Sequence, residues 1–434
     1  MLLVFCQKVT SRIDYIFSHV FFQALNFPFR FTNDISTFVA HNGPKMSYGT
    51  KPLGNEFFIE AVPLLFEQGL QDVSIQVKKW KTHQCFFESS KDASFPFDVF
   101  AASFYLISRY EEYLPHVKDE HGRFQSKQSL AQQYQFISTP LIDLWIEELR
   151  LALIKDYPAL ENKTNSSPEF MPLVEVVTPY KYLHKSVFRN TVQWLKAVFQ
   201  LNLWEMVEHP LVLMGIRKDP WDTFDTLISL FSKKSFSIKV FFLFSKESYV
   251  DRGISPLNTS FQILIKKVAD YFSVSLLASH ATASSAKQLG KERSNLSKLI
   301  HRPVDELRYA GGVTTAMDSY GNLLAQEIKS DFSLSYPNIM GYRASTAVPF
   351  YLYDLSNEIA TNLKVFPVVA NERYLSQNNP NVCLSNLEEL RNKLPLSTCV
   401  HCFVLSNKIL ENSEDNKEKR NAYISYLKTH DKKG

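Results

Sequence analysis

The stretch NTSFQILIKKVADYFSVSLLAS at residues 258–279 predicts one helix followed directly by one strand. Its first residue, Asn258, is of a type that caps helices. An apolar helix face then recurs at helical spacing, formed by Phe261, Leu264, Ile265 and Val268. The apolar run at 274–279 is short enough to be a buried strand. A helix that leads straight into a buried strand is typical of a parallel α/β sheet.

The same arrangement occurs elsewhere in the second half of the chain. DPWDTFDTLISLF at 219–231 begins with an Asp-Pro start signal and predicts a helix, and IKVFFLF at 238–244 predicts a fully buried strand. Three more apolar runs predict strands, at 173–177, 363–369 and 399–405. This number of units favours a closed or nearly closed (β/α) barrel, in which functional groups follow the carboxyl ends of the strands.

The polar segment ENKTNSSPEF at 161–170 separates two apolar regions and predicts a domain boundary near residue 168. Before it, VSIQVKKW at 73–80 alternates like a half-buried strand, and 95–114 carries apolar residues at helical spacing. We therefore expect an α/β protein: a smaller α+β domain over residues 1–168, followed by a deformed (β/α) barrel over residues 169–434.

Composition narrows the classes of function. A net charge of +4, spread along 434 residues, forms no basic stripe and argues against nucleic-acid binding. No stretch of about 18 consecutive apolar residues occurs, and the N-terminal apolar run is too short for a signal peptide, so we expect a cytoplasmic protein without a membrane span. Among five scattered cysteines, Cys399 and Cys402 form a CxxC, which we interpret as packed thiols rather than half a zinc site.

Several strings, in this order, resemble one family. They are FPFDVFAASFYLISRYEEYLP with the following DEHGRF, then DPWDTFDTL, VFFLF, GYRASTAVPFYLYDL and TNLKVFPVV. They look like a bacterial branch of the polysaccharide deacetylases that carries an extra N-terminal domain, and the resemblance spans about residues 45–407. It implies a deformed (β/α) barrel that removes acetyl groups from N-acetylated sugars. It also implies a divalent metal held by one Asp and two His, a second Asp as base and a late His as acid.

The first family motif, an Asp-x-Asp before a tyrosine-rich run, is altered here. In LVEVVTPYKYLHK at 173–185, Tyr180 and Tyr182 fit the run, whereas Glu175 and Val177 stand at the two acidic positions. A glutamate can still serve as a base, but valine cannot bind a metal.

The remaining motifs are altered unequally. His280 is all that is left of a His-Pro-Ser-Tyr turn, and Arg308 in ELRYA stands where the family carries a histidine. GYRAST keeps Arg343, in the place of the arginine that orients the catalytic carboxylate, and Tyr342 precedes it. Ser406 stands where the acid histidine would be. A catalytic metal needs about three protein ligands and an open position, so no metal is expected and His280 is a vestige.

Three hypotheses follow. The first is a metal-free, catalytically inactive deacetylase-like protein that binds a sugar or a protein partner in cell-surface polysaccharide biosynthesis. Its degenerate catalytic positions are Glu175, Arg343 and Ser406, and its cleft residues are Tyr180, Tyr182, His280 and Tyr342. The second is an active N-deacetylase that holds a metal such as zinc with substitute ligands, for which the spare residues are Asp331, Glu306, Asp305 and His301. The third is a scaffold whose aromatic-rich N-terminal domain does the binding.

Two geometric expectations accompany the first hypothesis. A buried Glu175 needs a partner, since an unpaired carboxylate is costly, and Arg343 is the natural one. Val177, His280 and Ser406 should surround one concavity at the carboxyl ends of the strands, with Arg343 on its wall.

Overall fold

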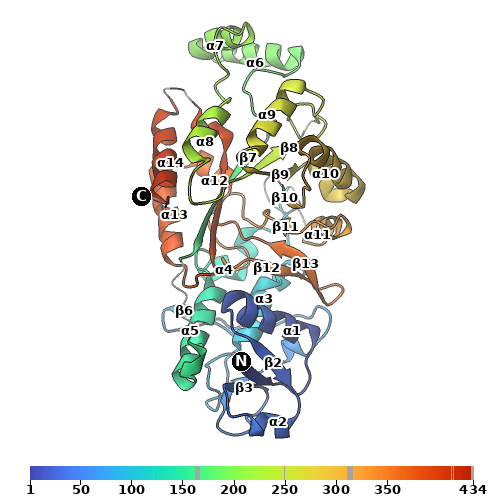
Figure 1. Ribbon diagram of the computed structural model, residues 1–434, viewed down its shortest axis with the longest axis vertical. Coiled ribbons are helices and arrows are strands. Elements are labelled where there is room, and N and C mark those ends of the chain that lie inside the picture. The colour runs from blue at the N-terminus through green and yellow to red at the C-terminus, as the bar shows by residue number, and fades with distance from the viewer. Residues whose placement is uncertain are drawn as a thin grey trace.

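The N-terminal part of the chain lies at one end of an elongated molecule, and helices α6 and α7 project at the other (Figure 1). The computed structural model describes residues 1–120, 122–161, 167–248, 250–309, 316–411, 413 and 415–431, with the backbone alone at 316–318. The expected boundary near 168 stays a prediction, because residues 162–166 lie outside the described ranges.

The N-terminal part contains a four-stranded sheet in the order β2-β1-β3-β4. Its strands are β1 (Leu2–Phe5), β2 (Phe29–Thr32), β3 (Lys45–Gly49) and β4 (Phe57–Glu60). All three pairings are parallel, so this sheet is of the α/β kind, unlike the expected α+β arrangement. The helices are α1 (Ser11–Phe17), which continues as a π-helix over Ser18–Ala24, α2 (Ile35–Ala40), α3 (Val99–Ile107), α4 (Leu130–Gln133) and α5 (Leu141–Asp156).

The strand expected at 73–80 is much shorter in the structure. Only β5 (Lys78–Trp80) pairs, in an antiparallel hairpin with β6 (His83–Cys85). Val73, Ile75 and Val77 do pack against the core as the alternation indicated, but no neighbouring strand pairs with them. Alternation therefore identified the buried side chains correctly and the backbone pairing incorrectly, because a ladder also needs a partner strand.

The helix expected within 95–114 is α3, and its ends have clear local causes. Asp98 accepts hydrogen bonds from the backbone N–H groups of Phe100 and Ala101, at 3.1 and 2.9 Å, and so caps the N-terminus. Arg109 has a φ of 55°, which is left-handed, and the helix ends before it. Every residue of α3 is buried.

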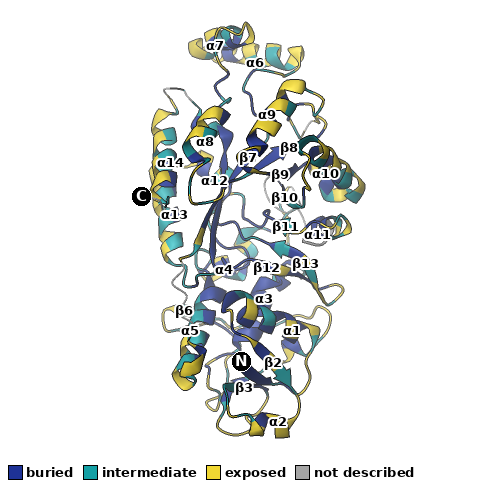
Figure 2. Cartoon of the chain, in the orientation of Figure 1, coloured by how far each residue is buried: buried dark blue, intermediate teal, exposed yellow. Residues whose placement is uncertain are grey.

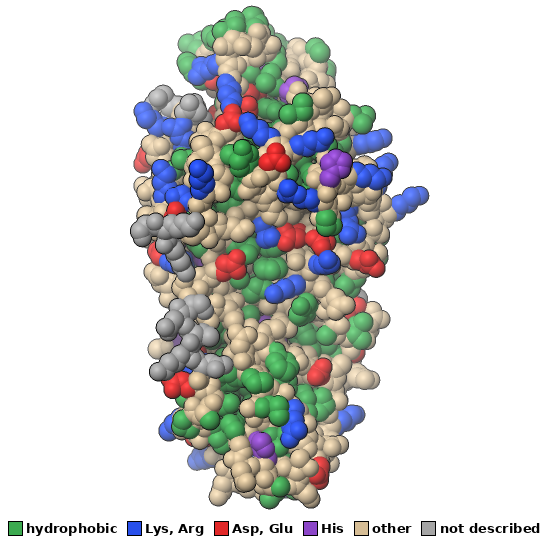
Figure 3. All heavy atoms as spheres, viewed as in Figure 1, with side chains coloured by type: hydrophobic (Ala, Val, Ile, Leu, Met, Phe, Trp, Pro, Cys, Tyr) green, Lys and Arg blue, Asp and Glu red, His purple; other side chains and the backbone are tan. Residues whose placement is uncertain are grey.

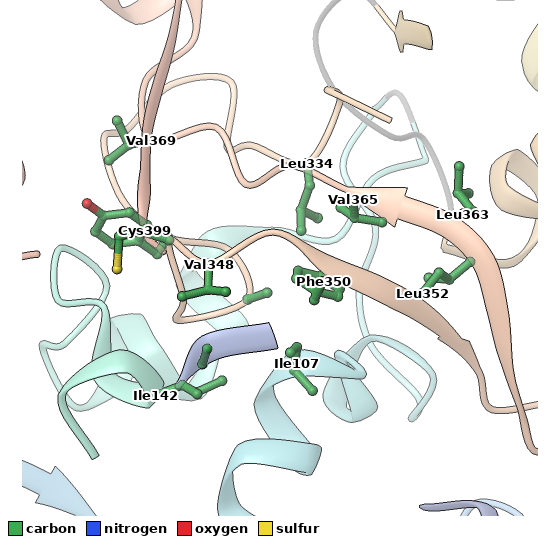
Figure 4. Packing of buried hydrophobic residues seen from close by; sticks show 14 of the residues in the cluster. Ile107, Ile142, Leu334, Val348, Phe350, Leu352, Leu363, Val365, Val369 and Cys399 are labelled. Atoms are coloured by element: carbon green, nitrogen blue, oxygen red, sulfur yellow. The ribbon is translucent and has the colours of Figure 1, made fainter. Parts of the chain in front are cut away.

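The buried face of α3 joins the N-terminal part to the rest of the chain. Figure 4 shows Ile107 of α3 and Ile142 of α5 next to Val348 and Phe350, which lie where the chain enters β12. All four belong to one hydrophobic cluster that extends through both parts of the chain. The two parts therefore share a core.

The second part is built on an eight-stranded sheet in the order β12-β13-β11-β10-β9-β8-β7-β14. Its strands are β7 (Glu169–Val176), β8 (Lys239–Leu243), β9 (Ser273–Ala278), β10 (Glu306–Tyr309), β11 (Ser330–Asp331), β12 (Phe350–Asp354), β13 (Ile359–Val365) and β14 (Val400–Ser406). All neighbours pair in parallel except β12 with β13. The parallel α/β sheet and the expected strands at 173–177, 238–244, 274–279 and 399–405 are confirmed, whereas the strand expected at 363–369 begins and ends four residues earlier.

Helices cover the outer face of this sheet, where their exposed sides contrast with the buried strands (Figure 2). They are α8 (Phe224–Phe231), α9 (Thr259–Ala269), α10 (Ala286–Ile300), α11 (Ala316–Ala325), α12 (Glu372–Gln377), α13 (Pro380–Asn392) and α14 (Lys417–Thr429), whereas α6 (Val187–Phe199) and α7 (Leu203–Leu213) form the hairpin that projects beyond the sheet. Asn258 caps α9 as expected and accepts from the N–H of Phe261 at 2.9 Å. None of the described helices is long and apolar enough to cross a bilayer.

The sheet curls into a half-barrel with an apolar interior. Val369 N donates to Cys402 O at 2.8 Å and Val404 N donates to Ala370 O at 2.9 Å, so the segment after β13 reaches β14 at the far edge of the sheet. The interior cluster is Met171, Leu173, Phe241, Leu243, Leu277, Phe332, Val368, Val400, Cys402 and Val404. Cys399 and Cys402 are buried free thiols, as interpreted.

Candidate functional site

Strand alternation places four residues of interest near the carboxyl ends of the barrel strands. Glu175 and Val177 continue the inward series of Met171 and Leu173 on β7. Ser406 continues the inward series of β14 and is the register partner of Glu175. Arg308 on β10 is the register partner of the interior residue Leu277.

Glu175 and Arg308 form an ion pair inside this end of the barrel. Arg308 Nε donates to Glu175 Oε2 at 2.9 Å, and Arg308 Nη1 donates to the backbone oxygen of Phe332 at 2.5 Å. The Arg308 side chain is fully buried and that of Glu175 is 9% exposed. Arg308 Nη2 has no hydrogen-bond partner among the described residues. One buried guanidinium therefore neutralises the carboxylate.

The expected pair between Glu175 and Arg343 is wrong. Arg343 Nε and Nη2 donate to the two carboxylate oxygens of Glu112, at 2.9 and 2.8 Å. The loop that carries Arg343 is held against the N-terminal part, since Tyr342 N donates to Ile137 O at 2.8 Å. Arg343 therefore meets a carboxylate from the other part of the chain, whereas Glu175 has its cation from β10.

Glu112 is the centre of a buried charged group contributed by both parts of the chain. Arg109 Nη1 lies 3.4 Å from Glu112 Oε2, and its guanidinium lies 4.9 Å from the ring centroid of Tyr320. Burial alone would raise the pKa of Glu112, but the charges of Arg343 and Arg109 lower it overall. Tyr320 in turn donates to Asp331 at 3.2 Å.

Asp331 connects this group with the barrel interior. Burial raises the pKa of Asp331, while hydrogen bonds from Ser333 and the charge of Arg308 act in the opposite direction. Buried acidic and basic groups thus extend from Glu175 through Arg308 and Asp331 to Arg109 and Glu112 of the N-terminal part.

The negative charge of Glu175 affects the pKa of a second carboxyl group, that of Glu372. Glu372, the first residue of α12, has a raised pKa chiefly because its carboxyl group is partly removed from solvent, and next because of the negative charge of Glu175. The positive charge of Lys408 opposes this rise. The region thus combines acidic groups with Arg308 and Lys408, a mixture able to hydrogen-bond a polar ligand.

Ser406 and His280 have local backbone roles. Ser406 Oγ accepts from the backbone N–H of Lys408 at 3.3 Å and so caps the turn that follows β14. His280 is exposed, and its backbone N–H donates to the carboxylate of Asp251 at 3.0 and 3.1 Å. The expectation that Arg343 lies on one wall with these residues does not fit its bidentate contact with Glu112.

The predicted cleft tyrosines have different surroundings. Tyr182 stacks on His209 with ring centroids 4.4 Å apart and contacts Glu208 at 3.1 Å, while its backbone N–H is held by Asp219 at 2.9 Å. Tyr180 is buried and lies 5.0 Å from the ring of His184. These contacts form the base of the α6–α7 hairpin.

Tyr342 lies toward the amino ends of the strands, away from Glu175 and Arg308. Its pKa is raised far above the ordinary value by burial and by the nearby charges of Asp143 and Cys399. Because Cys399 immediately precedes β14, Tyr342 is placed toward the amino end of that strand. Its neighbours are thus those of the interface with the N-terminal part.

Three residues proposed as substitute metal ligands lie apart from the carboxyl ends of the strands or form ion pairs with lysines. Glu306 begins β10 and pairs with Lys239 at 2.7 Å, and Asp305 before it pairs with Lys329 at 2.8 Å. Both thus lie at the amino end of β10, away from the carboxyl ends. His301 follows α10 in a left-handed conformation. Among the described residues, no group of three His, Cys, Asp or Glu is arranged to hold a metal.

The residues that the sequence resemblance assigns to a metal do not fit a divalent cation. Val177 has no ligand atom, and His280 is exposed. The carboxylate of Glu175, at the base position of that resemblance, already has the guanidinium of Arg308 2.9 Å away, and Ser406, at the acid position, caps a turn. We therefore derive no chemical step through a metal.

Sequence reasoning missed the roles of Arg109, Glu112 and Arg308. Arg308 is a charged residue within the short apolar run that forms β10, and a buried cation there needs a carboxylate such as Glu175. Glu112 stands in SRYEEYLP, which was used for resemblance only. A buried pair of charges between distant segments leaves no local periodicity that would reveal it.

Comparison with known proteins gives one family and a set of solved structures. Residues 2–158 match the sequence profile of a family of unknown function (DUF7033). No curated protein sequence matches the chain.

The solved structures are distant. A Mycobacterium smegmatis protein named as a polysaccharide deacetylase has 9% identity and a TM-score of 0.37, over 62% of this chain and 85% of its own. A probable polysaccharide deacetylase from Pseudomonas aeruginosa PAO1 has 14% identity and a TM-score of 0.37, over 60% and 86%. Puue allantoinase has 9% identity and a TM-score of 0.34, over 60% and 85%. At these scores the fold assignment rests on the strand order and register of the chain itself.

Proposed function

We propose that this chain is a polysaccharide deacetylase-like protein that binds a carbohydrate without hydrolysing it and without a catalytic metal. The Glu175–Arg308 ion pair carries the proposal. By the sequence resemblance, it occupies the place where the family holds its acidic pair and one of its histidines. A role in cell-surface polysaccharide metabolism, through a sugar or a protein partner, is part of the same proposal.

The pair opposes metal binding for an electrostatic reason. A guanidinium keeps its proton at any accessible pH, so the positive charge of Arg308 is permanent. At an effective dielectric constant of about 20, two unit charges roughly 4 Å apart repel by about 4 kcal/mol, and a divalent ion doubles this. Glu175, with Val177 beside it, offers too few ligand atoms to offset such repulsion.

The same pair favours a neutral polar ligand. Arg308 Nη2 is a buried donor without a partner among the described residues, and such a donor gains from an acceptor. Sugar hydroxyl and acetamido oxygens are acceptors of this kind. Glu372 and Lys408, whose charges act in the same region, supply further hydrogen-bonding groups.

Elemental analysis of the purified chain, dialysed without chelator, tests the absence of a metal. We expect no stoichiometric zinc, cobalt or nickel and no release of acetate from N-acetylated oligosaccharides. One bound equivalent that is lost with His280→Ala would overturn the metal-free proposal and favour the active N-deacetylase.

Calorimetric titration with N-acetylchitooligosaccharides tests the binding role. We expect saturable binding that Glu175→Gln weakens, because the substitution frees Arg308 from its carboxylate and changes the charge of the site. The matched control is Glu358→Gln, which alters a carboxylate paired with Arg12 in the N-terminal part. Absence of binding, or equal loss in both variants, would contradict a sugar site at Glu175.

A further inference from the structure

The hairpin of α6 and α7 exposes apolar stripes at helical spacing. On α6 the stripe consists of Phe188, Val192, Leu195 and Phe199, spaced by four, three and four residues. Such a stripe normally faces the core of a protein. Here Phe188 is 77% and Phe199 is 85% exposed, and within α6, which is described throughout, Ala197 is the one buried residue.

The turn and the second helix continue this surface. Leu201 in the turn is 80% exposed with a left-handed φ of 52°, and Leu203 at the start of α7 is 72% exposed. Val207 and Met214 follow at the same helical spacing and are also exposed. An apolar groove lies between the helices, lined by Trp194 and other side chains of both helices.

This apolar surface lies at the end of the molecule opposite the N-terminal part (Figure 1). Figure 2 shows α6 and α7 as mostly exposed, and Figure 3 shows hydrophobic side chains gathered over this end with Lys and Arg side chains below them. The rest of the chain therefore leaves the hairpin tip accessible to a large flat surface.

The charge of the hairpin indicates what could cover it. Residues 181–218 contain six Lys or Arg and two Glu, a net charge of +4 that equals that of the whole chain. Lys181, Arg189, Arg217 and Lys218 are paired with acidic side chains, whereas Lys185 and Lys196 form no ion pair among the described residues. Two such hairpins facing one another would repel, whereas an anionic surface would attract one.

We propose that the α6–α7 hairpin docks this protein on an anionic membrane surface. Its apolar stripes enter the boundary between headgroups and acyl chains, and the exposed Lys196 contacts the headgroups. Amphipathic helices with aromatic and aliphatic residues on one side and basic residues on the other bind bilayer interfaces in this way. The proposal needs no membrane span and does not rest on the proposed carbohydrate site.

Vesicle flotation of the full chain tests the docking. We expect the protein to float with vesicles of equal parts phosphatidylglycerol and phosphatidylcholine, and much less with phosphatidylcholine alone. The emission of Trp194 and Trp204, which are exposed, should move to shorter wavelength on addition of the anionic vesicles. Raising the salt concentration should weaken binding, because the headgroup attraction is screened.

Matched variants separate the hairpin from general surface effects. Leu201→Ser with Leu203→Ser should lower the vesicle partition coefficient about tenfold or more, since two exposed leucines no longer enter the interface. The control replaces two other exposed aliphatic residues, Leu257→Ser with Ile263→Ser, and should leave it unchanged. Lys196→Glu should weaken flotation severalfold, while the exposed Lys91→Glu should not.

Three results would overturn the docking proposal. The wild-type chain could fail to float with anionic vesicles, or the hairpin and control variants could lose flotation equally. Sedimentation velocity could also show a concentration-dependent dimer that the hairpin variant abolishes without any flotation, in which case a second copy covers the surface.

Discussion

The substitution Glu112→Gln examines the buried charges between the two parts of the chain. Glu112 accepts two hydrogen bonds from Arg343 and lies 3.4 Å from Arg109. The side chains of all three are at most 3% exposed. The glutamine keeps the shape of the side chain but removes the carboxylate that neutralises two buried guanidinium groups. Removing one partner of a buried ion pair costs about 3–5 kcal/mol.

This cost can be converted into a melting temperature. An unfolding entropy of about 2.1 cal/mol/K per residue gives about 0.9 kcal/mol/K for 434 residues. We therefore expect differential scanning calorimetry at neutral pH to find the Glu112→Gln variant melting about 3–5 °C below the wild type. Glu389→Gln, which removes an exposed carboxylate paired with Lys393, is the control and should not measurably change the melting temperature.

The pH dependence gives an independent check on Glu112. Its pKa is lowered in the folded chain, so its contribution to stability is present above the unfolded carboxyl pKa of about 4.3 and is lost as pH falls through the lower folded value. The difference between wild type and Glu112→Gln should therefore shrink in acid. A variant that melts within about 1 °C of the wild type at neutral pH would refute the reasoning that these charges are buried together.

Two further predictions concern other buried groups. Burial raises the pKa of Asp143 to about 7. The stability that protonated Asp143 contributes is therefore present in acid and is lost as pH rises through that value. We expect the fall in melting temperature between pH 5 and 8 to be smaller for Asp143→Asn than for the wild type. All five cysteines are buried and free. A thiol reagent should therefore react slowly with the native chain and reach five equivalents after unfolding. Rapid reaction of the native chain would show that Cys399 and Cys402 are not packed.

The sequence predicted those features of the fold that depend on neighbouring residues. Asn258 was expected to begin a helix and does, because a cap needs only a side-chain oxygen and the amide groups that follow. The buried strand at 238–244 is predicted for a similar reason, since a short continuous apolar run is typical of a buried strand. Local chemistry decides such elements.

Features that depend on distant residues could not be predicted in the same way. Glu175 was correctly expected to need a cation, because burial of an unpaired carboxylate is costly. The identity of that cation depends on the curl of a sheet in which β8 and β9 lie between β7 and β10. Arg343 was expected instead, although its loop is anchored to the N-terminal part by the hydrogen bond from Tyr342.

The position of Arg343 has a consequence for how the two parts of the chain depend on each other. An arginine carried on the barrel side is neutralised by Glu112, which follows a helix whose every residue is buried. Ile107 of the same helix packs beside the segment entering β12 (Figure 4). A barrel without residues 1–120 would expose this apolar surface and leave the guanidinium of Arg343 without its carboxylate. The N-terminal part therefore completes the shared apolar core and supplies the carboxylate that neutralises Arg343, so we expect the folding of the barrel to depend on it.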